Sequence, residues 1–381
     1  MIRFLFIFLL FLVSLLAVLP APTYHLWILA ILVTEFPWVF IILTIILFLF
    51  KTRLIWYRRA GSILAFITLI LFLSPVFSAY AIAAKLPAAL QTAFGKKAAD
   101  LRELHLKKPY SFFSMFSGID GKVLPFQTFT YKTYPGIRLQ LDFYSVKAVS
   151  KKPCVVIIHG GSWSGGDDKQ LPELNSYLAR RGYQVASIDY RLAPDYKNPQ
   201  SVEDVKNAIQ YLKINAKKLQ IDTNHFVLLG RSAGAQVALL AAYTLKNENI
   251  KGVISYYGPA DMIWGYAVPS NPMVLNSRQV MEDYLGGTYK QVPANYAASS
   301  PILQVNAQSV PTLLIHGKND VLVAYEHSKR LNAKLNGLKV KHYLLTLPWA
   351  THGCDYSLNG PGGQLATYTV ERFLNVVTVS K

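Results

Sequence analysis

A serine in a glycine-flanked turn is the first residue whose setting could support chemistry. The segment 226-FVLLGRSAGAQVALL-240 places Ser232 in a G-x-S-x-G pentapeptide between an apolar run and a run of small residues. In a strand–turn–helix unit, small flanking residues let the strand and helix approach and leave the serine hydroxyl exposed. The helix N-terminus also places partial positive charge behind the hydroxyl. The segment therefore predicts a nucleophilic serine, and the alternative is an ordinary tight turn.

A serine nucleophile needs a base to take its proton and an acid to orient that base. Downstream of Ser232, Asp320 follows the apolar run 312–315, and His352 follows the run 340–346. Both runs are predicted strands, so the loops after them lie at the same sheet edge as the serine. We expect Asp320 to hold the imidazole of His352, and His352 to accept the serine proton.

Other acidic and histidine residues compete for these roles. Asp261, which follows another predicted strand, is the best alternative acid. Asp355 lies too close to His352 in the chain to orient it. His316 precedes the turn that carries Asp320, which favours a structural role, and His327 and His342 fall in a helix-like and a strand-like run.

The glycine-rich segment 155-VVIIHGGSWSGGDDKQ-170 could bind a phosphate or an oxyanion. A phosphate-binding P-loop needs G-x-x-x-x-G-K-[ST], which is absent, and Asp167 and Asp168 would repel a phosphate. The loop follows a predicted strand and precedes the nucleophile in the chain. Its backbone N–H groups, with that of Ala233, are therefore expected to meet the negative oxygen of a tetrahedral intermediate.

Four separated motifs together resemble a known superfamily. They are His159-Gly160-Gly161-Ser162-Trp163, the segment DYRLAP at 189–194, Gly230-Arg231-Ser232-Ala233-Gly234, and His316-Gly317-x-x-Asp320. In this order they resemble the α/β-hydrolase superfamily, specifically its hormone-sensitive-lipase-like esterases and their HGG-x-W branch. That branch includes feruloyl-esterase-like, kynurenine-formamidase-like and prenylcysteine-methylesterase-like enzymes. The resemblance covers about residues 125–378.

The resemblance implies roles for particular residues. Ser232 would be the nucleophile, Asp320 the acid and His352 the base, with an oxyanion hole from Gly161, Ser162 and Ala233. Ser162 departs from many relatives, which have a third glycine there. Neither a metal nor an organic cofactor is implied. The five aromatic residues expected to line an apolar substrate pocket are Trp163, Tyr190, Tyr257, Trp264 and Trp349.

The function expected from these residues is that of a serine carboxylesterase, which cleaves esters through an acyl-enzyme. Family analogy favours a small-molecule or lipid-like ester with a modest acyl chain or an aromatic group over long triacylglycerols. Two alternatives stay open: an amidase or deformylase of the kynurenine-formamidase type on the same triad, and a non-catalytic membrane protein that binds or senses a ligand. The sequence says nothing of the oligomeric state.

Strands that alternate with helices must position these groups. After about residue 126 the pattern predicts an α/β fold, with a mostly parallel central sheet covered by helices on both faces. Residues 259–305 lack this alternation and contain five prolines, which predicts a cap-like insertion. Residues 85–125 are expected to form a linker or cap helix region, and 126–381 the catalytic domain. Cys154 and Cys354 do not form a disulfide framework.

The first 84 residues contain three apolar stretches: Phe4 to Leu19, Leu26 to Phe50, and Ile63 to Ala84. A bilayer crossing takes about 20 apolar residues, and three stretches in succession favour three transmembrane helices over a cleaved signal. Lys51, Arg53, Arg58 and Arg59 lie between the second and third stretches, so this loop is expected in the cytoplasm. The prediction is a multi-pass inner-membrane protein whose catalytic domain lies outside the cytoplasm.

Two charge features remain. Glu35 lies inside the second apolar stretch beside Pro37, and it is either a functional carboxylate in the membrane or a residue paired where the helix breaks near Pro37. The net charge of +18 has two interpretations: attraction to anionic lipid headgroups near the anchor, or simply a generally basic proteome. No recognised nucleic-acid-binding signature accompanies it, so nucleic acid is not an expected partner.

Overall fold

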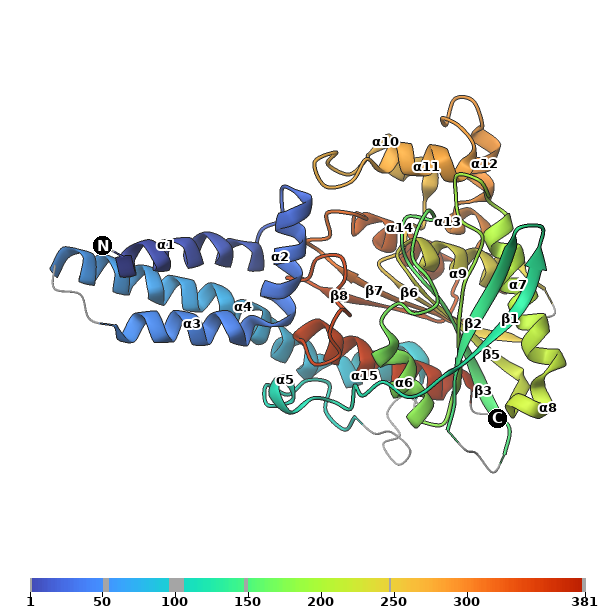
Figure 1. Ribbon diagram of the computed structural model, residues 1–381, viewed down its shortest axis with the longest axis horizontal. Helices are drawn as coiled ribbons and strands as arrows, with labels where there is room; N and C mark the ends of the chain where they lie inside the picture. Colours follow the sequence, from blue (N-terminus) through green and yellow to red (C-terminus); the bar gives the residue numbers. More distant parts are fainter. Residues whose placement is uncertain (1, 51–54, 96–105, 147–149, 247, 379–381) are drawn as a thin grey trace.

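An eight-stranded sheet forms the centre of the larger domain in the computed structural model, which describes residues 2–50, 55–95, 106–146, 150–246 and 248–378 (Figure 1). The strand order is β1-β2-β4-β3-β5-β6-β7-β8. β1 pairs antiparallel with β2 and β2 with β4, whereas the other neighbours are parallel. The expected mostly parallel sheet is therefore confirmed. The strands are β1 Gln127–Tyr134, β2 Ile137–Tyr144, β3 Lys152–Ile158, β4 Gln184–Ile188, β5 Ile221–Arg231, β6 Ile250–Tyr256, β7 Thr312–Gly317 and β8 His342–Leu347.

Each face of the sheet has its own apolar core because successive strand side chains point to opposite faces. In β3, Val156 and Ile158 belong to one core, and Val155 and Ile157 to the other. The first core is covered by α7 Gln200–Ile214, α9 Ala233–Thr244 and α14 Glu326–Gly337, with the short α8 Ala216–Leu219 beside them. The second is covered by α6 Pro172–Arg180, α15 Pro361–Thr378 and the second half of α4.

Four short helices lie within the expected insertion at residues 259–305. They are α10 Met262–Ala267, α11 Ser277–Leu285, α12 Pro293–Ala298 and α13 Pro301–Gln304. Figure 1 shows α10, α11 and α12 together at the top of the view, beside the sheet edge that carries the functional loops. They belong to the segment between β6 and β7, which is called the cap below.

The N-terminal region differs from the expected three transmembrane helices. The first apolar stretch folds into α1 Ile2–Ser14 and the short 3-10 helix η1 Leu15–Ala17. The second is broken into α2 Tyr24–Glu35 and α3 Pro37–Leu49, which are bent by 84° relative to each other. Only the third lies in a helix that is long and apolar enough to cross a membrane alone, and the bent pair would add one more span at most.

The physical reason for the break is Pro37, which starts α3 as its first residue and cannot donate the backbone hydrogen bond that a continuous helix needs. Phe36 at the junction has a non-helical backbone conformation. The alternative of a helix broken near Pro37 is therefore the one that the structure shows. Lys51 and Arg53 of the expected cytoplasmic loop lie outside the described residues.

Helix α4 Ile55–Phe94 runs across the expected boundary between residues 84 and 85. Its first half packs beside α1 and α3, and its second half lies against α15 and the sheet (Figure 1). Leu86, Leu90 and Phe94 are buried in the second core, where the ring of Phe94 meets Phe373 with centroids 5.2 Å apart. The short helix α5 Ser114–Ser117 follows. One helix therefore joins the N-terminal bundle to the larger domain.

Candidate active site

Ser232 lies on the sharp turn between β5 and α9, as the G-x-S-x-G pattern predicts. Its backbone angles are φ 52° and ψ −122°, a conformation that costs about 1–3 kcal/mol and recurs at functional sites. A Cβ at Gly230 would lie 2.2 Å from the carbonyl oxygen of Gly234, and a Cβ at Gly234 would lie 2.2 Å from that of His159. Only glycine fits either position, so the turn can close and hold the serine at the start of α9.

Asp320 and His352 meet at the carboxyl ends of β7 and β8. The Nδ1 atom of His352 lies 2.7 Å from Oδ2 of Asp320. The other carboxylate oxygen, Oδ1, accepts the backbone N–H groups of Leu322 and Val323 at 2.9 Å each. Burial alone would raise the pKa of Asp320, but the neighbouring His352 and His316 hold it well below its usual range. Asp320 is therefore an anion held at the Nδ1 edge of the imidazole.

The competing residues are held by other partners. Asp261 caps α10 through the N–H of Trp264 at 3.0 Å and pairs with Arg330 at 2.8 Å, so it is committed to the cap. His316 bonds Ser328 through Nδ1 at 2.7 Å and lies 3.2 Å from Asp320 through Nε2, which makes it a support for that carboxylate. His327 and His342 bond the backbone of Asp261 and Val340.

A buried network that sequence reasoning missed lies behind the imidazole. Asp355 accepts hydrogen bonds from Arg231 Nε and from the Tyr257 hydroxyl. The Tyr257 ring packs on His352 with centroids 4.2 Å apart. Arg231 directly precedes Ser232 in the chain, so this network links the Ser232 turn to the loop that carries His352. The sequence signals that could have indicated this network are Arg231, inside the pentapeptide, and Asp355, three residues after His352.

The glycine-rich loop after β3 is a tight turn. Gly161 has φ 126°, and a Cβ there would lie 2.1 Å from the carbonyl oxygen of Gly165. Ser162 and Trp163 follow in the left-handed region, with φ 55° and 59°. This conformation explains why glycine is favoured at position 162. Gly161 and Ser162 line the larger of two cavities with Ser232, and Ser162 and Ala233 line the smaller.

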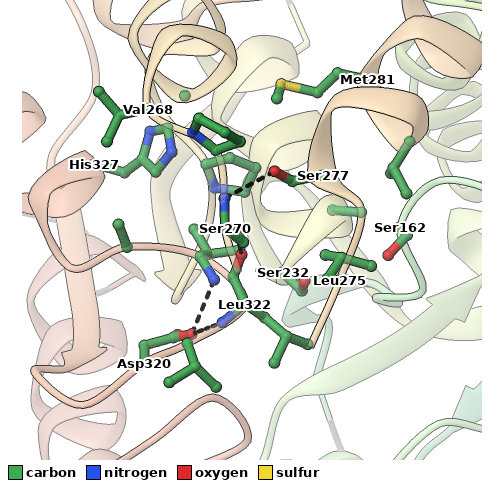
Figure 2. Close-up of a pocket in the computed structure, with 18 of the residues that line it drawn as sticks. Ser162, Ser232, Val268, Ser270, Leu275, Ser277, Met281, Asp320, Leu322 and His327 are labelled. Atoms are coloured by element: carbon green, nitrogen blue, oxygen red, sulfur yellow. Dashed lines mark hydrogen bonds between the residues drawn. The ribbon is translucent and has the colours of Figure 1, made fainter. Parts of the chain in front are cut away.

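Two cavities meet at Ser232. The smaller, of about 200 Å³, lies under the cap and is lined by Asp320, Met281 and His327 among others (Figure 2). The larger, of about 800 Å³, is lined by His352 and Tyr257 and by residues of the N-terminal helix α2. Ser162, Leu275, Val280 and Leu322 border both. A substrate held over Ser232 therefore has one small compartment and one large one available.

Two of the five aromatic residues that were expected to line the substrate pocket do line a cavity, and three do not. Trp163 lines the smaller cavity and Tyr257 the larger. Trp163 also donates to Gln236 and stacks on Tyr284, so it anchors the glycine loop as well. The other three line neither cavity, because their rings pack elsewhere: Tyr190 on His159, Trp264 against His327, and Trp349 in the second core.

Helix α2 supplies cavity residues, most of them from the stretch Leu26 to Phe50 that was expected to be a membrane helix. Tyr24, Trp27, Ile28, Ile31 and Leu32 line the larger cavity. Their spacing of three and four residues is that of one helix face. The Nε1–H of Trp27 donates to the carbonyl oxygen of His352 at 3.0 Å. The spacing of these residues could have indicated a cavity-lining helix face. The other residues of the stretch are also apolar, so the face does not stand out in the sequence.

Comparison with known proteins agrees with this architecture. Esterase LipC of Mycobacterium tuberculosis is 29% identical over 260 residues, which cover 63% of this chain and 63% of LipC. The probable carboxylic ester hydrolase LipM of the same organism is 25% identical over 237 residues, covering 58% of this chain and 54% of LipM. The chain thus spans about half to two thirds of the length of these relatives.

Solved structures show the same fold. A truncated carbohydrate esterase from gut microbiota has a TM-score of 0.54 at 20% identity, covering 65% of this chain and 95% of its own. An acetyl ester-xyloside bifunctional hydrolase from Caldicellulosiruptor lactoaceticus has a TM-score of 0.54 at 21% identity, covering 62% and 91%. The sequence model of the BD-FAE family matches residues 141–335, just over half of the chain, and includes the glycine loop, Ser232 and Asp320. The chain, an α/β hydrolase in its fold, therefore belongs to the BD-FAE family.

Proposed function

We propose that this protein is a serine carboxylesterase attached to a membrane. The observation that carries the proposal is the pairing of His352 with the anionic Asp320 at 2.7 Å, beside a strained Ser232 that lines the same cavity as His352. The chain order serine, acid, histidine is that of α/β hydrolases. The similar proteins named as esterases support ester hydrolysis as the reaction.

In the proposed reaction, Ser232 Oγ attacks the ester carbonyl carbon while its proton passes to Nε2 of His352. The tetrahedral intermediate then expels the alcohol, whose oxygen takes that proton from His352, and an acyl-enzyme remains. Water next gives a proton to His352 and its oxygen attacks the acyl carbon. Collapse releases the carboxylic acid and returns the proton to Ser232. Asp320 stabilises the imidazolium that forms in both halves.

The oxyanion in each intermediate is proposed to accept hydrogen bonds from the backbone N–H groups of Gly161, Ser162 and Ala233. Ala233 is the first residue of α9, where the helix dipole adds positive potential. The left-handed backbone of Ser162 fixes the direction of the loop amides. Loss of one such donor typically costs about 100- to 1000-fold in turnover.

The test is hydrolysis of p-nitrophenyl acetate and p-nitrophenyl butyrate by the purified protein and its Ser232→Ala variant. We expect the alanine variant to be inert, and Ser117→Ala, which changes an exposed serine of α5, to retain full activity. Full activity in Ser232→Ala would overturn the assignment. A phosphonate that labels the wild-type protein and not the alanine variant would identify the nucleophile independently.

Membrane attachment is proposed through a bundle formed by α1, α3 and the first half of α4. Large apolar side chains are exposed on its outer surface, among them Leu5, Phe8, Ile45, Ile63 and Phe66. Soluble monomers rarely expose contiguous apolar patches of this kind. We propose that the larger domain lies outside the cytoplasm. Alkaline phosphatase fused after Gly95 should be active, and an inactive fusion would place the domain in the cytoplasm.

A further inference from the structure

The cavity-lining face of α2 is apolar and continuous. Tyr24, Trp27, Ile28, Ile31 and Leu32 lie along about two and a half turns of the helix and all border the larger cavity. The glycine loop, Ser232 and His352 line the same cavity. Ile28 and Leu32 are 43% and 41% exposed, so the cavity has an apolar mouth along α2.

Three sets of contacts hold α2 over the site. At its start, the Tyr24 N–H donates to the carbonyl oxygen of Met273 at 3.1 Å, and the Asn271 amide donates to that of Pro22 at 3.0 Å. In the middle, Trp27 donates to the His352 carbonyl oxygen. At its end, buried Glu35 accepts the N–H groups at the start of α15. The helix is therefore a fixed wall of the site.

The opposite side of α2 packs on the N-terminal bundle. Ala30 and Val33 are buried with Leu16, Ile41 and Phe72 in a third apolar cluster. Figure 1 shows α2 lying across the end of α1, α3 and the first half of α4, between that bundle and the larger domain. One helix thus separates the active-site cavity from the surface that we propose to lie in lipid.

The two cavities differ in capacity. The cavity on the α2 side has a volume of about 800 Å³, four times the 200 Å³ of the cavity on the cap side. The α2 side therefore has the more room for a long hydrocarbon chain, and the cap side suits a smaller group.

We propose that the substrate is a lipid ester resident in the bilayer, whose hydrocarbon chain passes along the apolar face of α2 into the larger cavity. This proposal rests on the proposed esterase function. It departs from the modest or aromatic acyl groups that family analogy favours, because α2 lies outside the region matched to the BD-FAE family. The apolar face of α2 would provide the chain with a path from the bundle surface to Ser232.

The test uses the full-length protein in phosphatidylcholine vesicles, with p-nitrophenyl palmitate and p-nitrophenyl butyrate as substrates. Ile28→Trp fills part of the larger cavity, and Leu26→Trp places the same side chain on a position of α2 that does not line it. Excluding two methylenes from an apolar site costs about tenfold in binding. We expect the ratio of palmitate to butyrate turnover to fall at least tenfold in Ile28→Trp and to stay unchanged in Leu26→Trp.

The route is tested by the position of the palmitate ester. Ester mixed into the vesicles that hold the protein should be cleaved much faster than the same ester in separate protein-free vesicles. Equal rates would show entry from water and overturn the bilayer route. An unchanged ratio in Ile28→Trp would overturn the role of α2. Cleavage of butyrate alone would refute the lipid substrate and leave the esterase function standing, whereas cleavage of neither ester would refute the function itself.

Discussion

The change Asp320→Asn tests how the triad is held. In the structure, Oδ1 accepts two backbone N–H groups at 2.9 Å, and Oδ2 faces His352 Nδ1 at 2.7 Å. An asparagine must keep its carbonyl oxygen toward the two backbone donors, because its amide NH2 group cannot accept from them. The NH2 group then faces His352 and donates to Nδ1. This arrangement forces the imidazole proton onto Nε2, the atom that must accept the proton of Ser232.

The expected loss follows from that tautomer. An imidazole with its proton on Nε2 cannot act as the base, and in serine triads this change lowers kcat by about 10,000-fold, or about 5.5 kcal/mol of transition-state stabilisation. The assay is kcat and KM for p-nitrophenyl butyrate, with thermal unfolding to confirm that the variant is folded. We expect KM to change by less than about threefold, since the acid does not contact the substrate.

Asp261→Asn is the matched control because Asp261 is the other candidate acid and is committed to Arg330 and the α10 cap. It should retain activity within about twofold and lose less than about 1 kcal/mol of stability, because asparagine caps a helix as well as aspartate does and only the part-exposed ion pair with Arg330 is lost. The reasoning fails if Asp320→Asn keeps a tenth or more of the wild-type kcat. It fails equally if Asp261→Asn is the variant that loses turnover.

Three further predictions concern groups around the site. Ser162→Gly should raise stability by up to about 1 kcal/mol in urea unfolding, because Ser162 has φ 55°, and should leave ester turnover intact, whereas Ser162→Val should lower both. Glu35→Ala should cost about 2 kcal/mol in unfolding measurements, because the N–H groups of Gly362 and Gly363 lose their acceptor, and Glu35→Gln should restore most of it. Burial, with nearby carboxylates, raises the pKa of Asp168 to about 7, so the stability gained from its protonated form is complete below about pH 4 and lost as the pH rises through 7. Asp168→Asn should therefore raise the melting temperature at pH 8 by about 2 °C and leave it unchanged at pH 3.5, and an equal shift at both would contradict this origin.

The parts of the site that follow local rules could be predicted from the sequence. Gly230, Ser232 and Gly234 specify a turn that only glycines can close, and the alternation of apolar runs with helical patterns placed Asp320 and His352 after parallel strands. Close packing of a strand against the next helix depends on residues near each other in the chain. Residue type and spacing are therefore enough to predict it. Tyr190 and Trp349 show the limit, because an aromatic residue near a functional loop packs equally well in the core.

The position of α2 could not be predicted, because it depends on a partner more than 300 residues away in the chain. Glu35 binds Gly362, and Trp27 binds the carbonyl of His352. By composition, Leu26 to Phe50 is one hydrophobic stretch. Composition does not distinguish the apolar side chains that face lipid from those that face a cavity or another helix. Glu35 is the charged residue of this stretch and the one that does not suit a membrane helix. It ends α2 and accepts the hydrogen bond from Gly362 that holds this end of the helix on the larger domain.

The length of α4 has a practical consequence for producing the protein. A soluble fragment beginning after Gly95 would discard Leu86, Leu90 and Phe94, each buried in the core beneath the sheet. At about 1.5–3 kcal/mol for each large buried side chain, their loss removes about 5–9 kcal/mol from a domain whose net stability is typically about 5–15 kcal/mol. Such a fragment would expose the apolar surface of α15 that the second half of α4 covers, and we expect it to aggregate. Because the bundle is proposed to lie in a membrane, the whole chain in detergent or nanodiscs is the preparation expected to stay folded.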